Sequence, residues 1–224
     1  MGVTTSRLHP DLRAELRSFV SSVDRSDGEP ALSEYKEMRL DGRLDARERV
    51  AFSDDGGLIG YGQAAWHRSA TDADGQWAME IVVDPHFRDA SVAQDLIDSL
   101  LDEARGADMI LWARTPYVTE AARSAGGVRE RELLEMRRSL PIECLDTSVE
   151  GFRLSTFRIG VDERDWLRAN NAAFAGHPEN GSMTRRDLED RIAQTWFDVD
   201  GFFLAWDGDD LAGSCSVSYT HLRA

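Results

Sequence analysis

The chain has 224 residues, a formal net charge of −15 and a sequence pI of about 4.7. Such an acidic surface disfavours nucleic-acid phosphates and anionic membranes as partners, whereas 42% hydrophobic residues is enough for a buried core. No apolar run is long enough to span a bilayer, and the N-terminus lacks the apolar segment of a signal peptide, so we expect a cytoplasmic protein. Cys144, Cys215 and the five histidines show no metal-ligand spacing, and we expect free thiols and no bound metal.

The first 141 residues predict a mixed α/β domain, because an antiparallel hairpin is followed by βαβ crossovers. The hydrophobic spacing and the turn residues define each element. In chain order we expect helices at 9–23 and 33–40, strands at 48–52 and 58–67 joined by a turn at 54–57, a loop at 69–75, a strand at 77–83, a helix at 88–104, a strand at 109–113, a helix from Thr115 to 124, and a long strand at 128–140. The sheet should carry helices on both faces.

After an acidic linker at 142–151, a second run of elements begins in the same order. Its elements are expected as a strand at 152–158, a helix at 162–175 capped by Asp162, a helix at 184–195 capped by Thr184 with Asp187 in a capping box, a strand at 201–206, a turn at 207–210 and a strand at 211–216. Repetition at this scale predicts a tandem protein. The second copy would be incomplete and would leave apolar faces and a strand edge uncovered.

The last eight residues, 217–224, resemble a translated sequencing-library adapter. We therefore expect a complete first domain at 1–141, the linker at 142–151, the first half of a second domain at 152–216 and a non-native tail at 217–224. The alternative is a genuine strand end, since Val-Ser-Tyr-Thr is a reasonable strand sequence.

The segment 80–96 carries the clearest functional pattern. A β-branched strand ends at Pro85, and an amphipathic helix begins near Arg88. A strand that leads directly into a helix N-terminus presents free backbone N–H groups and the positive end of the helix dipole, and the two together form an anion site. The plain alternative is an ordinary strand–turn–helix connection.

This segment resembles motif A of the GCN5-related N-acetyltransferases, in which the loop cradles the pyrophosphate of acetyl-CoA. The matching residues are Val83, Pro85, Arg88, Ser91, Ala93 and Leu96. The resemblance implies the acetyltransferase fold and a cofactor site formed by Ile81, Val82, Val83, Arg88, Asp89, Ala90, Ser91, Val92 and Ala93. Ser91 replaces the first glycine of the family pattern, and its Cβ is expected to weaken phosphate binding.

Three further stretches, 27–34, 177–181 and 196–203, resemble the mycothiol synthases, a family of tandem acetyltransferases. The resemblance implies acetyl transfer from acetyl-CoA to the cysteinyl amine of a glucosaminyl-inositol, with Glu34 and Glu179 contacting this small-molecule substrate. Asn180 and Val199 depart from the family pattern. In that family the first domain binds acetyl-CoA without catalysing. The catalytic residues should then lie beyond Ser216, so we expect residues 1–224 alone to be an inactive fragment.

Two other functions stay open at this point. One is a non-catalytic acyl-CoA-binding module, which Ser91 would suit, and the other is an acetyltransferase acting on a different amine. Glu80, on the strand before the motif, is expected as a buried acid or in a salt bridge. We expect a monomer that binds neither nucleic acid nor membrane.

Overall fold

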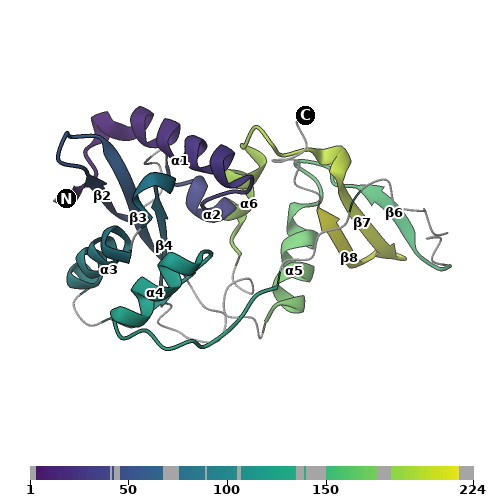
Figure 1. The fold of residues 1–224 in the computed structure, drawn as a ribbon. Coiled ribbons are helices and arrows are strands. Elements are labelled where there is room, and N and C mark those ends of the chain that lie inside the picture. Colours follow the sequence, from purple (N-terminus) through teal and green to yellow (C-terminus); the bar gives the residue numbers. More distant parts are fainter. Residues whose placement is uncertain are drawn as a thin grey trace. The chain divides into compact units, whose positions relative to one another are not determined.

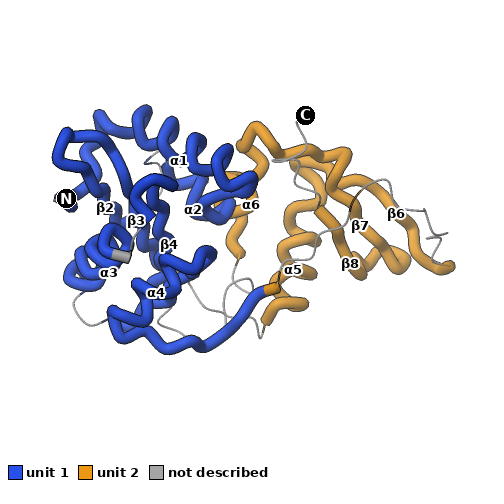
Figure 2. The backbone as a smooth tube through the Cα atoms, in the orientation of Figure 1, with its two compact units in different colours: residues 1–67, 75–133 blue, residues 68–74, 134–224 orange. Residues whose placement is uncertain are grey.

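The computed structural model (Figure 1) describes residues 4–40, 42, 46–67, 76–88, 90–104, 107–134, 139, 150–175 and 183–216. The chain divides into two compact units (Figure 2). Unit 1 comprises residues 1–67 and 75–133, and unit 2 comprises residues 68–74 and 134–224. None of the helices in these described segments has the length and hydrophobicity needed to cross a membrane.

Unit 1 is built on a five-stranded mixed sheet in the order β1-β2-β3-β4-β5. The strands are antiparallel up to β4, and β4 pairs in parallel with β5. The strands are β1 (Thr4–Arg7), β2 (Arg47–Phe52), β3 (Leu58–His67), β4 (Gln76–Val83) and β5 (Met109–Leu111). The helices are η1 (Pro10–Leu12), α1 (Arg13–Asp27), α2 (Glu34–Glu37), η2 (Pro85–Phe87), α3 (Ala90–Ala104) and α4 (Pro116–Ser124). The predicted mixed α/β fold is confirmed.

Helices cover both faces of this sheet (Figure 1). Because neighbouring residues of a strand point to opposite faces, β4 contributes to two cores. Ile81 and Val83 pack with α3 and α4, and Val82, between them, packs with α1. The segment predicted to bind the cofactor therefore lies in the middle of the unit, fixed from both sides.

Helix α3 lies unusually close to β3, at two glycines. A Cβ built on Gly60 would lie 3.0 Å from Leu96 Cδ1, and one on Gly62 would lie 3.0 Å from Leu100 Cδ1. Real Cβ atoms almost never lie closer than 3.0 Å to another heavy atom of this kind. The missing side chains at Gly60 and Gly62 thus allow α3 to approach the sheet closely. The start of the predicted anion site, which belongs to α3, is positioned in the same way.

We expect Gly62→Val to destabilise unit 1 by about 1–3 kcal/mol, because the added methyl groups overpack the interface with α3. Urea unfolding followed by tryptophan fluorescence measures the change. The matched control is Gly213→Val, on strand β8 (Asp210–Ser216) of unit 2, where a Cβ would meet nothing within 4 Å. Equal stability of the Gly62→Val variant and the parent chain would show that α3 can shift without cost.

One predicted strand is wrong and one was missed. Residues 128–134, expected as the start of a long strand, have no regular structure, and Val128 and Leu134 are 90% and 82% exposed. Alternating hydrophobic residues alone do not make a strand, which also needs a partner for its backbone. Conversely, the polar sequence Thr4–Arg7 forms β1 because β2 pairs with it. The loop expected at 69–75 lies outside the described residues.

Unit 2 contains a three-stranded antiparallel sheet in the order β6-β7-β8. Its elements are β6 (Arg153–Thr156), α5 (Glu163–Ala173), α6 (Arg185–Ile192), η3 (Val199–Gly201), β7 (Phe202–Asp207) and β8 (Asp210–Ser216). The capping box of Thr184 and Asp187 is present as predicted. Asp162 occupies the N-cap position of α5 but makes no side-chain cap hydrogen bond; its carboxylate accepts from the Arg158 guanidinium instead.

The strands and long helices of unit 2 follow the same order as β1, α1, α2, β2 and β3 of unit 1, and their strands pair in the same way. Its core is formed mainly by aromatic residues, with Phe157 stacked on Phe202 at 4.7 Å and Trp166 edge-on to Phe202 at 5.5 Å. The division into two acetyltransferase-like copies stays a prediction. The tail at 217–224 and most of the linker at 142–151 lie outside the described residues.

Candidate functional site

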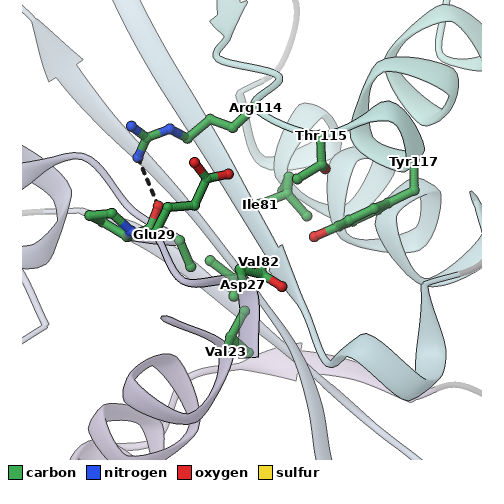
Figure 3. A pocket seen from close by; sticks show the side chains of 10 residues that line it. Val23, Asp27, Glu29, Ile81, Val82, Arg114, Thr115 and Tyr117 are labelled. Atoms are coloured by element: carbon green, nitrogen blue, oxygen red, sulfur yellow. Dashed lines mark hydrogen bonds between the residues drawn. The ribbon is translucent and has the colours of Figure 1, made fainter. Parts of the chain in front are cut away.

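The candidate site lies where β4 and β5 part. Their parallel ladder joins only Trp77–Met79 to Met109–Leu111, and its last bond runs from Trp112 N to Met79 O at 3.0 Å. Strand β4 continues to Val83 without β5 beside it. Between the end of β4 and the residues after β5 lies a small pocket with a cavity volume of about 10 Å³, which is room for about one water molecule (Figure 3).

Three parts of unit 1 line this pocket. They are the end of α1 with the loop that follows it, the last residues of β4, and the start of α4 with the residue before it. The lining residues are Val23, Asp27, Glu29, Pro30, Ala31, Ile81, Val82, Arg114, Thr115 and Tyr117. Among the residues that the structure describes, the Thr115 hydroxyl oxygen is buried without a hydrogen-bond partner. A buried hydroxyl of this kind at a pocket wall fits a polar ligand that supplies the missing bond.

The loop between α1 and α2 is held over the pocket from two directions. Gly28, with φ of 70°, ends α1 and turns the chain. Ala31 N then donates to the Asp24 carboxylate at 2.7 Å, and the Arg114 guanidinium donates to Pro30 O at 3.1 Å (Figure 3). The loop is therefore tied both to its own helix and to the segment that follows β5.

The residues predicted from motif A do not all have the same environment. Ile81 and Val82 line the pocket, and Val83, Val92 and Ala93 are buried in the core. Ser91 lies exposed in the first turn of α3, which is where the anion site was expected. Asp89 and the side chain of Ala90 lie outside the described part of the structure.

Arg88 points back into unit 1. One guanidinium nitrogen lies 2.6 Å from the Asp27 carboxylate, and its Nε donates to Val83 O at 3.2 Å. The guanidinium also lies 5.3 Å from the centre of the Tyr117 ring. The hydrogen bond to Asp27 raises the pKa of Arg88, so this side chain stays charged while it joins the ends of α1 and β4 to α4.

Glu80 is buried, as expected in one of the two alternatives, a buried acid or a salt bridge. Its carboxylate accepts hydrogen bonds from both the backbone N–H and the hydroxyl of Ser33, the N-cap residue of α2. Glu34 is the first residue of that helix and is half-buried. Glu34 is not among the residues that line the pocket, and Glu179 lies outside the described residues.

Lys36 is the single lysine of the chain and is only 1% exposed. Its ammonium group donates to Ala78 O on β4. Burial lowers the pKa of Lys36 to about 7; the nearby Glu80 carboxylate opposes this shift and Arg39 adds to it. The short helix α2 is thus anchored to β4 through Lys36 as well as through Ser33.

The lowered pKa of Lys36 predicts that the free energy of unfolding depends on pH. The pKa of Lys36 is about 7 in the folded chain and 10.5, the ordinary lysine value, in the unfolded chain, so between these pH values the unfolded chain binds one more proton. The free energy of unfolding should then rise with pH in this window, by up to about 1.4 kcal/mol per pH unit. Urea titrations at pH 7, 8 and 9 measure the slope, which Lys36→Met should remove.

Selective ¹³C labelling of lysine gives an independent measurement, because one lysine gives one Cε resonance. That resonance should titrate with a midpoint near 7. A midpoint near 10.5 together with an unchanged slope in Lys36→Met would contradict the prediction.

Eight of the ten lining residues were not identified from the sequence as site residues. They are Val23, Asp27, Glu29, Pro30, Ala31, Arg114, Thr115 and Tyr117. Asp27 was noted only as the first residue of a family-like stretch, and Thr115 only as the start of a helix. Part of the third stretch, 196–203, is structural, because the Phe197 ring packs edge-on to Phe202 in the core of unit 2.

Comparison with solved structures defines the class of protein. The structure is similar to a GCN5-related N-acetyltransferase from Sphaerobacter thermophilus, with a TM-score of 0.60 at 19% identity, over 96% of this chain and 71% of that one. The mixed α/β fold of this chain thus matches an acetyltransferase fold.

The sequence comparison identifies the family. The chain is 40% identical over 215 residues to mycothiol acetyltransferase of Geodermatophilus obscurus, covering 93% of this chain and 68% of the relative. It is 38% identical over 213 residues to the mycothiol acetyltransferase of Streptomyces bingchenggensis, covering 91% and 68%. No family model matches the chain. The chain belongs to the mycothiol acetyltransferase family and is an acyltransferase.

Proposed function

We propose that unit 1 binds acetyl-CoA, with the pantetheine arm along Ile81–Val83 and the pyrophosphate at the start of α3. The observation that carries this proposal is the pocket between the parted strands β4 and β5, which adjoins the strand that leads into α3. The unpartnered Thr115 hydroxyl in its wall supports a polar ligand such as the pantetheine amides.

The proposed reaction is acetyl transfer to the cysteinyl amine of a glucosaminyl-inositol in mycothiol biosynthesis. The cofactor supplies the acetyl group as a thioester, which a neutral amine can attack. Glu34 and Glu179 are proposed to bind the ammonium and the sugar hydroxyls of the acceptor, since carboxylates form charge-assisted hydrogen bonds with both. The base that takes the amine proton is not assigned among the described residues.

The cofactor site is tested by Ser91→Gly. Removing the Cβ lets phosphate oxygens come closer to the backbone of α3, so the affinity for acetyl-CoA should rise about fivefold, roughly 1 kcal/mol. Isothermal titration calorimetry on the full chain measures this change. Ser91→Ala is the matched control, because it removes the hydroxyl but keeps the Cβ. A gain in Ser91→Ala as large as in Ser91→Gly would assign the effect to the hydroxyl instead.

The acceptor site is tested by Glu34→Gln. Loss of this carboxylate should weaken binding of the cysteinyl glucosaminyl-inositol about tenfold, about the energy of one charged hydrogen bond, and leave acetyl-CoA binding unchanged. Glu37→Gln, an exposed residue of the same helix, is the control. Equal affinities in all three proteins would remove Glu34 from the acceptor site.

The inactivity of residues 1–224 stays a prediction. Release of the CoA thiol on mixing the chain with acetyl-CoA and the acceptor measures turnover. Turnover would contradict the expected inactivity while supporting the proposed acceptor, and turnover with another amine but not with this one would favour a different substrate.

A further inference from the structure

The Asp27–Arg88 ion pair is a prominent charged contact beside the pocket. Both side chains are largely buried, with 17% and 23% of their surface exposed, and the closest oxygen and nitrogen are 2.6 Å apart. Surface ion pairs contribute little because water and salt screen them, but a pair that is this shielded is screened less. The contact joins α1 to the segment between β4 and α3, two parts of the chain 61 residues apart.

Asp27 is placed against the preference of its own helix. It is the last residue of α1, which Gly28 terminates. The C-terminal end of a helix carries partial negative charge, so a carboxylate there is unfavourable for the helix itself. The favourable interaction that the structure gives Asp27 is the one with the Arg88 guanidinium. The interaction with Arg88, and not the stability of α1, therefore accounts for a carboxylate at this position.

Arg88 is the basic residue of the segment that enters α3. Arg88 precedes the first residue of α3 by two positions, and the charge of its guanidinium is balanced by a carboxylate of the same chain. The Asp27 carboxylate also faces the pocket, on the same side as the Tyr117 ring (Figure 3), and that ring lies 5.3 Å from the Arg88 guanidinium. The Arg88 side chain thus connects two residues of the pocket wall, Asp27 and Tyr117.

We propose that Asp27 sets the affinity of this site for phosphate-bearing ligands by acting as an internal counterion of Arg88 that the cofactor phosphates must displace. This inference rests on the proposed binding of acetyl-CoA to unit 1. Because the carboxylate is attached to the same chain, its effective concentration at Arg88 is high, and a phosphate in solution competes at a disadvantage.

The proposal predicts a gain of binding on removal of a charge. In Asp27→Asn the side chain keeps its shape but no longer neutralises Arg88. The affinity for acetyl-CoA should rise about tenfold, and it should fall more steeply with added salt, because a free guanidinium now meets the phosphates. S-acetylpantetheine shares the arm and the thioester but has no phosphate, so its binding should show neither the tenfold gain nor the steeper salt dependence.

The experiment is calorimetric titration of the full chain with both ligands at two salt concentrations. Glu15→Gln is the matched control, since Glu15 is an exposed residue of the same helix and the change in net charge is the same. The double variant Asp27→Asn with Arg88→Gln should lose the gain, which shows that the effect of Asp27 acts through Arg88. Asp27→Ser serves as a second variant if Asp27→Asn does not fold.

Each outcome decides the matter. Tighter acetyl-CoA binding in Asp27→Asn, no such gain for S-acetylpantetheine and loss of the gain in the double variant support the proposal. Unchanged or weaker acetyl-CoA binding in both Asp27 variants overturns it, and leaves the proposed cofactor site intact as long as the parent chain binds. If neither the parent chain nor any variant binds acetyl-CoA, the proposed cofactor site fails and this inference fails with it.

Discussion

The candidate site depends on the unequal pairing of β4. On one edge β4 is bonded to β3 over the eight residues Gln76–Val83, and on the other it is bonded to β5 over only three. The long pairing keeps the free end of β4 straight, so that the strand does not collapse into the gap that β5 leaves. The pocket, and the position of the chain as it enters α3, both follow from this difference.

Polar contacts on the sheet face beneath α1 hold the two helices, α1 and α2, that flank the pocket loop. Arg13, at the start of α1, lies 2.6 Å from the Glu48 carboxylate, which also accepts from Tyr61 at 2.7 Å. Gln63 continues the chain of contacts to Lys36 O in α2. Buried polar groups tolerate displacement poorly because an unmade hydrogen bond costs free energy. The helices on either side of residues 28–32 are therefore held in place.

Where hydrophobic spacing and turn residues agree, the sequence predicts the elements well, as for β3 at 58–67 and the capping box of Thr184 and Asp187. The prediction failed where pairing decides the outcome. β1 has no hydrophobic pattern and exists through its pairing with β2, while 128–134, predicted as the start of a strand, has no regular structure. The pocket residues Asp27 and Tyr117 could not be found for the same reason, since only the folded chain brings α1 and α4 to the end of β4.

The arginines at the site are bound by oxygens of the chain itself. Arg88 is bonded to the Asp27 carboxylate and to Val83 O, and Arg114 is bonded to Pro30 O. The chain as a whole carries a net charge of −15, which disfavours anionic ligands. The proposed attraction for the cofactor phosphates then depends first on the backbone N–H groups and the dipole of α3, which no side chain can neutralise without covering the helix end. The arginine contributes once its internal partner has been displaced, which makes the strength of binding a property of the α1 terminus as much as of the phosphate loop.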